Sequence, residues 1–166
     1  YYSKQKDDWH ASLSYFYLGC IYRNGNRSTL AVEAFYKALQ RIPQGEWTKL
    51  RMQIYYNLAE RYYLQSLYKE ALDMYQDCLG EIVLMNDSSL FYFPYYGIGQ
   101  CFMSMKKYDS TLYYYQKALD NSRSFHGDDR TAIVLSDMSS AYFYKKDTVK
   151  ALDIYEYLAR DYIDVY

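Results

Sequence analysis

Apolar and small residues recur along this chain at the spacing of an α-helix, in short segments that come in pairs. The stretch from Tyr55 to Leu79 has two such helical faces, made by Leu58, Ala59 and Tyr62 and by Ala71, Tyr75, Cys78 and Leu79. The link between them, residues 65–67, leaves room only for a tight turn. The pattern therefore predicts an antiparallel helical hairpin, which needs neighbouring copies to bury its apolar faces.

The same pattern returns every 40 residues without an insertion. A shift of 40 aligns a small residue (Gly19, Ala59, Gly99, Ser139), a second position (Ala31, Ala71, Thr111, Ala151) and an aromatic position (Phe35, Tyr75, Tyr115, Tyr155). A fixed period of this kind is the signature of a repeat architecture. The sequence predicts one all-α domain over residues 1–166, a right-handed α-solenoid of four antiparallel helical hairpins with repeats at about 9–45, 46–85, 86–125 and 126–166.

Turn and capping residues place the ends of the helices. We expect helices at about 9–24, 27–42, 48–65, 68–84, 90–105, 108–124, 131–144 and 148–162. Asn24–Gly25–Asn26 indicates the turn of the first hairpin, and Pro43 indicates the end of its second helix. A Thr, Ser or Asp just before the first helix of each later repeat is expected to cap free N–H groups. Residues 1–8 look like the tail of an upstream element.

The first repeat carries the residues of a known repeat family. In their order these are Leu18, Gly19, Tyr22, Ala31, Phe35, Ala38, Leu39 and Pro43, and they resemble the tetratricopeptide repeat (TPR). The resemblance implies that the small residue on the first helix lets the second helix cross closely, with the alanine at position 31 receiving it. The usual unit has about 34 residues. The extra residues here, such as Glu46 to Arg51, are expected to lengthen the first helix of the next repeat.

Composition and charge exclude several classes of protein. The net charge is −1, with 19 basic and 20 acidic residues, and like charges never run beyond two, so the basic footprint of a nucleic-acid binder is missing. No apolar stretch approaches the roughly 20 residues of a membrane span, and the first residues do not form a signal-peptide pattern. We expect no nucleic-acid binding and no membrane contact by this fragment. The 25 tyrosines are expected mainly to fill the aromatic positions of the repeat.

Candidate chemistry is sparse. The three cysteines (Cys20, Cys78, Cys101) are isolated, and we interpret them as reduced, mostly buried thiols. They are compatible with the cytoplasm, although an upstream signal or membrane segment stays open. His10 and His126 are more than 100 residues apart in a repeat array, and no nucleophile, base and orienting group come together. We expect no enzyme activity, no cofactor and no metal.

The remaining candidate is a surface. In TPR proteins the first helices of successive repeats line a concave face that holds peptides or partner helices. Projection of the positions around each small residue gives a face with aromatic and mixed polar groups: Phe16, Arg23, Tyr56, Asn57, Glu60, Tyr63, Phe93, Tyr96, Gln100, Met103 and Phe143. The alternative is that Tyr56 and Tyr96 only pack against neighbouring first helices. The face lacks the basic residues with which TPR domains clamp acidic chaperone tails.

The third repeat departs from the pattern. Pro94, Gly97 and Gly99 fall within six residues of a first helix, where each is unfavourable in the interior. Either that helix starts late, near Phe93, or it is kinked. Gly99 is explained by helix crossing, whereas Gly97 could leave a gap that a ligand backbone approaches.

Two functions follow. The first is a non-enzymatic, protein- or peptide-binding scaffold, which by resemblance to Tyr-rich bacterial TPR proteins is the signal-receiving part of a larger regulator. The alternative is a structural or self-associating spacer. The last repeat leaves Ile154, Leu158 and Ile163 without a covering helix before the chain stops at Val165–Tyr166, which predicts a fragment that forms a homo-oligomer through this uncapped repeat.

Overall fold

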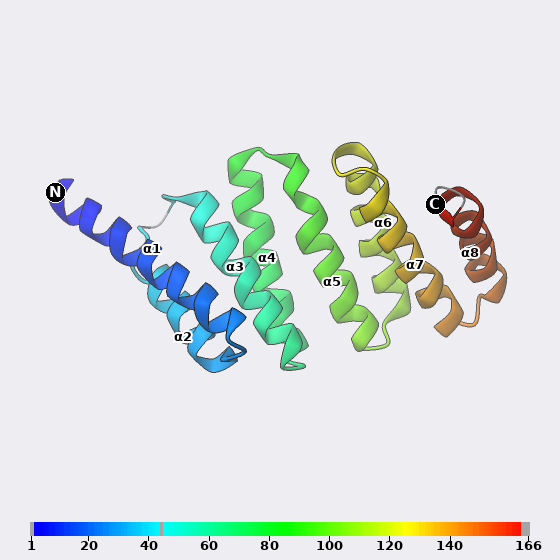
Figure 1. Cartoon of the computed structure of the whole chain (residues 1–166), viewed down its shortest axis with the longest axis horizontal. Coiled ribbons are helices and arrows are strands. Elements are labelled where there is room, and N and C mark those ends of the chain that lie inside the picture. The colour runs from blue at the N-terminus through cyan, green and yellow to red at the C-terminus, as the bar shows by residue number, and fades with distance from the viewer. Residues whose placement is uncertain (1, 44, 164–166) are drawn as a thin grey trace. The chain divides into compact units, whose positions relative to one another are not determined.

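A computed structural model describes residues 2–43 and 45–163, and every regular element in this part of the chain is helical (Figure 1). Consecutive α-helices pair into four hairpins: α1 (Tyr2–Asn24) with α2 (Ser28–Leu39), α3 (Thr48–Leu64) with α4 (Tyr68–Met85), α5 (Tyr92–Ser104) with α6 (Tyr108–Phe125), and α7 (Asp128–Tyr144) with α8 (Thr148–Ile163). A short 3₁₀ helix, η1 (Ser88–Phe91), precedes α5. The predicted all-α fold of four antiparallel hairpins is confirmed.

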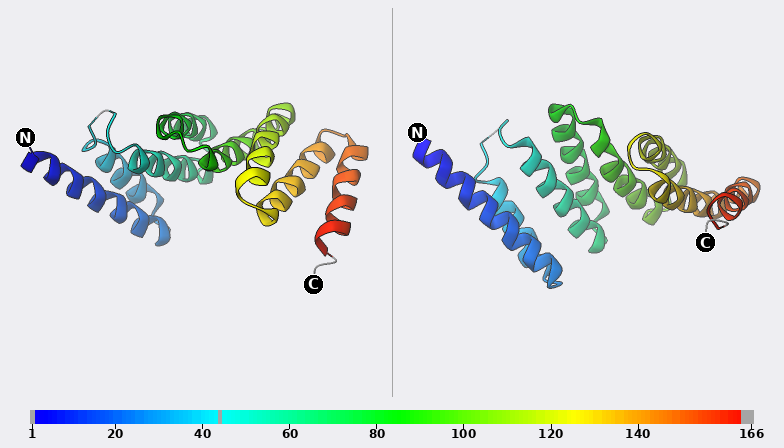
Figure 2. Two further views of the ribbon diagram at one scale, coloured as in Figure 1. Left: turned by 90° about the horizontal axis from the view of Figure 1, so that it is seen from above. Right: turned by 45° about the horizontal axis from the view of Figure 1, so that its top comes forward.

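The chain divides into two compact units, Tyr1–Asn86 and Asp87–Tyr166, which we call the N-terminal and the C-terminal unit. Each unit contains two hairpins, and the two helices of every hairpin lie side by side in all views (Figures 1 and 2). In the N-terminal unit α3 also contacts α2, and in the C-terminal unit α7 contacts α6. A single domain over the whole chain stays a prediction.

The four hairpins turn at the same position of the repeat. The residue with a left-handed backbone is Asn26, Ser66, Lys106 and Lys146 in turn, with φ of 56°, 61°, 59° and 68°. The next residue donates its N–H to the carbonyl oxygen five residues earlier, at 2.9 Å in every hairpin: Arg27 to Tyr22, Leu67 to Tyr62, Lys107 to Phe102 and Asp147 to Tyr142. This is the Schellman ending of a helix. The backbone therefore repeats with the 40-residue period of the sequence.

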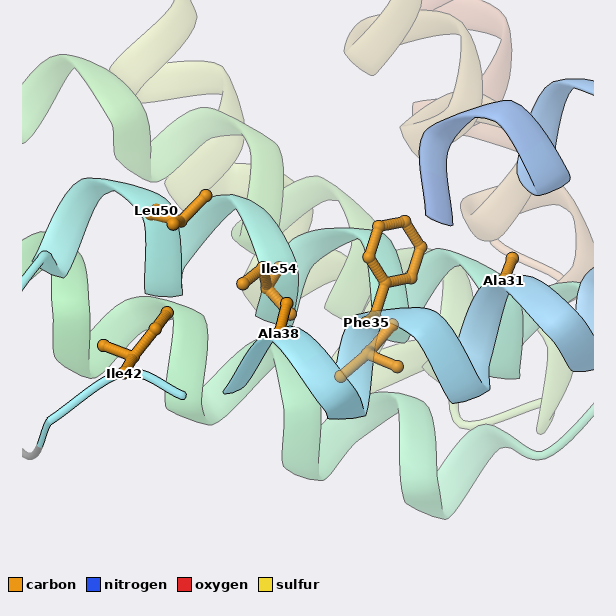
Figure 3. Close-up of a cluster of buried hydrophobic side chains, with 7 residues drawn as sticks. Ala31, Phe35, Ala38, Ile42, Leu50 and Ile54 are labelled. Carbon is orange, nitrogen blue, oxygen red and sulfur yellow. The ribbon is translucent and has the colours of Figure 1, made fainter. Parts of the chain in front are cut away.

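The core of the N-terminal unit lies between α2 and the first helices on either side. Ala31, Phe35 and Ala38 of α2 are fully buried, and Figure 3 shows Ala38 beside Ile54 of α3. At Gly19 of α1, an added Cβ would lie 2.6 Å from Cε1 of Phe35. The close crossing of α1 and α2 is thus confirmed, but the neighbour of the small residue is the aromatic ring and not Ala31.

The C-terminal unit has a core of the same kind. Tyr115 and Ala118 of α6 are buried together with Val134 and Met138 of α7 and with Tyr92 of α5. Tyr115 occupies the position that Phe35 holds in the N-terminal unit. Aromatic rings of the repeat pattern thus fill the core of both units, as expected from the composition.

Several helix ends differ from the prediction. Helix α1 begins at Tyr2 and not near Trp9. At the expected start, the ring of Trp9 lies 4.9 Å from that of Trp47, and Asp8 lies 3.6 Å from Arg41. Helix α2 ends at Leu39, three residues before the expected end. Arg41 and Ile42 there form i to i−3 hydrogen bonds, a tightening typical of a chain approaching proline.

The expected side-chain caps are mostly wrong. The residues before α3 and α7 are Trp47 and Gly127, and neither gives a side-chain cap. Thr131 lies inside α7, which begins three residues earlier, and its hydroxyl donates to the carbonyl of Gly127 at 2.9 Å. Only Asp87 acts as expected, because its carboxylate accepts from the N–H of Ser89 at the start of η1. Of the residues Glu46 to Arg51, which were expected to lengthen the first helix of the second repeat, only 48–51 are helical.

The late start of the fifth helix is confirmed. Helix α5 begins at Tyr92, which places Pro94 in its first turn, where a missing N–H costs nothing. Its N-terminus is capped from a distance, because Asn121 of α6 accepts from the N–H of Tyr92 (3.0 Å) and donates to the carbonyl of Ser88 (2.8 Å). Gly97 is buried in α5, and its proposed role toward a ligand stays a prediction.

Val165 and Tyr166, on which the predicted uncapped end partly rests, lie outside the described residues.

Candidate functional site

The two first helices of the N-terminal unit are joined by a polar contact between predicted site residues. Arg23 of α1 donates through Nη1 to Oδ1 of Asn57 of α3 at 2.5 Å. The Asn57 amide also donates to the carbonyl of Gln53 at 2.7 Å, and the residue is only 7% exposed. Because both ends of its amide are engaged, Asn57 is held in one orientation. This contact fixes the polar part of the α1–α3 face.

The other predicted residues of α3 are positioned by α4. The hydroxyl of Tyr75 donates to Oε1 of Glu60 at 2.6 Å, and the ring of Tyr56 lies 6.1 Å from that of Tyr75. The ring of Tyr63 lies 5.8 Å from that of Tyr68. All three α3 side chains are half-buried. They are therefore held in place by a packed helix while part of each stays accessible.

Phe16 differs from the rest of this set. Its ring lies 6.0 Å from that of Phe35 and packs against the N-terminal core. Its main contact is thus structural, although the residue is only half-buried.

Sequence reasoning missed Arg61, one helical turn after Asn57 on α3. Its Nε is buried and has no hydrogen-bond partner among the residues that the structure describes. Burial lowers the pKa of Arg61; the charge of Glu60 opposes this, and the charge of Arg23 adds to it. The projection around Ala59 took Tyr56, Asn57, Glu60 and Tyr63 and left out Arg61. The spacing of four residues from Asn57, which places both side chains on one helical stripe, could have indicated it.

In the C-terminal unit the first helices are also linked through a predicted residue. Tyr96 of α5 donates its hydroxyl to Oδ2 of Asp137 of α7 at 2.6 Å, and its ring stacks at 5.7 Å on the rings of Tyr92 and Tyr115. Tyr96 thus contacts the first helix α7 and the second helix α6, and its role in binding a partner stays a prediction. Burial raises the pKa of the Asp137 carboxyl, and the hydrogen bond from Tyr96 lowers it by less.

We expect Asp137→Asn to increase the stability of the folded protein at neutral pH. A carboxyl pKa that is raised on folding contributes stability below its ordinary value of 3.8, and this contribution is lost as the pH rises through the folded pKa. The difference between variant and wild type should therefore grow from pH 3.8 upward and then level off. Urea unfolding at several pH values measures it, and a difference that is independent of pH would contradict the assignment.

Phe93 lies in a cluster of rings around Arg130 at the start of α5. The guanidinium carbon of Arg130 lies 4.5 Å from the Phe93 ring centroid and 5.0 Å from that of Tyr92. The ring of His126 lies tilted to that of Tyr92 and edge-on to that of Phe93, and its Nε2 donates to the carbonyl of Ser89 at 2.7 Å. These contacts tie α5 and η1 to the loop before α7, so they support structure at least as much as recognition.

The last three predicted residues are not brought into one cluster. Gln100 and Met103 are half-buried on α5, while Phe143 near the end of α7 is 60% exposed beside Tyr144. Because the predicted set is divided between the two units, a continuous groove along the chain stays a prediction.

The cysteines form no reactive site of their own. All three are free thiols, with Cys78 and Cys101 buried. Burial, with a smaller contribution from the charge of Glu81, raises the pKa of Cys78 to about 12, and burial raises that of Cys20. The thiolates of Cys20 and Cys78, which would be their reactive or metal-binding forms, are therefore disfavoured. Among the described residues, no three histidine, cysteine or acidic side chains lie close enough to hold a metal ion. In the same part of the chain, every helix is too short or too polar to span a membrane.

Comparisons with known proteins agree with the hairpin architecture. A family model described as tetratricopeptide repeat matches residues 93–157. The structure of BtubC (BKLC) from P. vanneervenii aligns over 99% of this chain and 70% of its own, with 16% identity and a TM-score of 0.80. The apo form of RapI aligns over 93% of this chain and 58% of its own, with 15% identity and a TM-score of 0.83. A sequence search of curated proteins finds no match.

Both solved structures are helical-repeat proteins of the TPR type, and their likeness shows the fold of this chain. The chain spans only 58% of the length of RapI. The family match covers α5, α6, α7 and most of α8. These elements have the Gly99–Tyr115 crossing and the helix endings that recur in the N-terminal unit. The chain is therefore a helical-hairpin protein of TPR-like fold, and its residues 93–157 match the tetratricopeptide repeat model.

Proposed function

We propose that this protein is a non-enzymatic scaffold that binds a protein or an extended peptide through the face formed by α1 and α3. The observation that carries the proposal is the pre-organised polar contact between Arg23 and Asn57, flanked by the half-buried side chains of Tyr56, Glu60 and Tyr63. The tetratricopeptide repeat match supports it, because repeats of this kind generally serve protein interaction.

Physical reasoning favours this face as an interaction surface. Tyrosine and arginine are the side chains that dominate binding energy in interfaces. A partner that meets side chains already fixed by their neighbours has less conformational entropy to remove. On α3 this fixing is done by Tyr75 toward Glu60 and by Arg23 toward Asn57. The face therefore combines recognition groups with rigidity, which an inert spacer does not need.

Selection of random peptides displayed on phage against the full chain tests the proposal. We expect Tyr56→Ala to weaken the selected peptides by about tenfold or more, because a hot-spot tyrosine contributes over about 1 kcal/mol. Tyr113→Ala on α6, whose side chain is 57% exposed, is the matched control and should leave binding unchanged. Recovery of no peptide, or equal loss in both variants, would contradict a binding site on α1 and α3.

We further propose that the protein is the signal-receiving part of a larger bacterial regulator. The support is its resemblance to tyrosine-rich bacterial repeat proteins and its partial coverage of the solved structures that share its fold. The coding sequence on either side of residues 1–166 tests this. An output domain or a membrane segment there would support the proposal, and flanks that contain only further repeats would count against it.

Self-association is a second candidate, favoured by the exposed apolar side of α8. Val149 and Leu152 are 69% and 57% exposed, and Tyr155 is 45% exposed. If two copies meet through this side, sedimentation velocity should show a dimer that forms as the concentration rises. Leu152→Asp should abolish the dimer, while Leu64→Asp at the end of α3, where the side chain is 62% exposed, should not. A monomer at every concentration would exclude this candidate.

A further inference from the structure

We propose that copies of this chain associate head to tail, with the last hairpin of one copy packing on the first helix of the next. This inference rests on the self-association candidate above, and it names the surface that α8 meets. The surface on α1, which we call the receiving face, consists of the exposed side chains Tyr17, Leu18 and Ile21. The surface on the last hairpin, which we call the docking face, consists of the exposed side chains Phe143, Leu152, Tyr155 and Glu156.

The receiving face is exposed in the first repeat, and its counterpart in the second repeat is covered. Tyr17 is 57% exposed and Leu18 is 36% exposed. One period of 40 residues later, Asn57 is 7% exposed and Leu58 is fully buried. Leu58 belongs to the core cluster that α2 forms with α3. The hairpin of the first repeat thus buries, on α3, positions that stay open on α1.

The C-terminal unit follows the same rule. Met138 and Ala141 of α7 correspond to Leu18 and Ile21, and they are 5% and 0% exposed, whereas Ile21 is 64% exposed. Met138 lies in the core that α6 forms with α7. In both units, therefore, a preceding hairpin buries these positions of a first helix. A hairpin of the same repeat is the shape of partner that the receiving face fits.

The docking face presents the side chains that do this covering inside the chain. Phe35 of α2 is fully buried in the cluster that holds Leu58. Three periods of 40 residues later its counterpart is Tyr155 of α8, which is 45% exposed. Val32 packs against the same cluster, whereas its counterpart Leu152 is 57% exposed. The chain therefore presents, on α8 and on α1, the two halves of an interface that it completes between its own hairpins.

The contact between α1 and α3 predicts which side chains of two copies would meet. Arg23 donates to Asn57, and in a head-to-tail contact the same two positions hold Phe143 of one copy and Tyr17 of the next. These two residues are 60% and 57% exposed. Aromatic rings that meet in an interface gain from burial and from ring contact. A polar pair inside the chain is thus replaced by an apolar pair that a single copy leaves exposed to water.

Charge is complementary at a second pair of positions. Burial and, by smaller amounts, hydrogen bonding and the charge of Asp77 raise the pKa of the Tyr36 hydroxyl, so positions 36 and 77 lie close together. In a head-to-tail contact these positions hold Glu156 and Lys37, which carry opposite charges. Lys37 lines a cavity of about 150 Å³ between α1 and α2, and its only printed ion pair is an exposed one with Glu33. A second copy therefore brings an acidic side chain to a basic one.

The two faces differ, so the contact between copies is heterologous. Each added copy leaves one receiving face and one docking face free, and association can continue beyond a dimer unless a ring closes. A contact in which α8 of one copy meets α8 of another would instead be symmetric and would stop at two copies. The two arrangements therefore differ in how many copies they join.

Two variants that each block one face test the arrangement by sedimentation velocity. Ile21→Asp blocks the receiving face and Leu152→Asp blocks the docking face, so each variant alone should be a monomer. Their equimolar mixture should form a dimer that does not grow further, because the intact docking face of one variant meets the intact receiving face of the other. Wild type and the matched control Leu64→Asp, where the side chain is 62% exposed, should grow beyond a dimer as the concentration rises.

An exchange of charges gives a second readout, which keeps the apolar side chains in place. Lys37→Glu and Glu156→Lys should each weaken association by about threefold or more, because like charges then face each other. The chain that carries both changes should associate as strongly as wild type, since the pair is restored with its signs reversed. If the double variant associated more weakly than either single one, these side chains would not meet and the proposal would be overturned.

The outcomes separate this inference from the self-association candidate. A wild type that is monomeric at every concentration would overturn both. Association that Leu152→Asp abolishes and Ile21→Asp leaves intact would keep self-association through α8 and overturn the head-to-tail arrangement. A mixture of the blocked variants that stays monomeric, although wild type associates and both variants show wild-type helicity by circular dichroism, would overturn it as well.

Discussion

Gly99→Ala should destabilise the protein by about 1–3 kcal/mol, although alanine is the better helix former. In the middle of a helix the change alone would gain about 1 kcal/mol. Here the added methyl group would stand inside van der Waals contact with the ring of Tyr115, whose side chain is 2% exposed and encircled by the C-terminal core. Because the ring is buried among core side chains, the penalty of overpacking should exceed the gain in helix propensity.

Gly80→Ala is the matched control for this result. Gly80 lies inside α4, is exposed, and has no atom within 4 Å of the position of an added Cβ. Its replacement should stabilise the protein by about 0.5–1 kcal/mol, since only helix propensity changes. Urea unfolding of both variants measures the two effects with opposite signs. If Gly99→Ala proved as stabilising as Gly80→Ala, the tight crossing of α5 and α6 would be refuted.

This pair of glycines shows what the sequence could and could not predict. The 40-residue period predicted the hairpins and the positions of the small residues, because repeated units must cross and pack in the same way. The period did not reveal that the ring of Phe35 packs against Gly19, or that the ring of Tyr115 packs against Gly99. The left-handed backbone of Lys106 and Lys146 could not be predicted either, because lysine is not a residue that favours turns.

The sequence likewise predicted only part of the candidate site. Helical projection placed Arg23 and Asn57 on facing helices, and the structure joins them. Pairings across longer distances were not predictable, because they depend on how the hairpins dock. The capping of α5 by Asn121 and the bond from Tyr75 to Glu60 are of this kind. Arg61 was not predicted as a site residue, because a charged residue on a helix is usually solvated. Only the burial of its Nε, which the sequence does not show, distinguishes Arg61 from an ordinary surface arginine.

Glu81→Ala should produce the largest loss of stability among the charged residues, about 3 kcal/mol. Oε1 of Glu81 on α4 accepts a hydrogen bond from Nε of Arg51 on α3 at 2.6 Å. The side chain of Glu81 is only 8% exposed and that of Arg51 only 18%. Arg51 also donates to the hydroxyl of Tyr55 at 3.1 Å. Removal of the carboxylate leaves a largely buried cation with one neutral partner, a change that typically costs about 3–5 kcal/mol. The lower end applies because the charge of Asp77 remains nearby.

The pair Lys37–Glu33 on the surface of α2 provides the comparison, with side chains that are 47% and 56% exposed. Glu33→Ala should leave the urea midpoint nearly unchanged, because solvent replaces what an exposed ion pair loses. The double variant Arg51→Met, Glu81→Leu should recover most of the stability lost in Glu81→Ala, since an apolar pair leaves no charge uncompensated. A double variant as unstable as the single one would mean that the charges themselves hold α3 to α4. Recovery would instead show that the loss in Glu81→Ala comes mainly from the uncompensated charge of Arg51 and not from the loss of the ion pair itself.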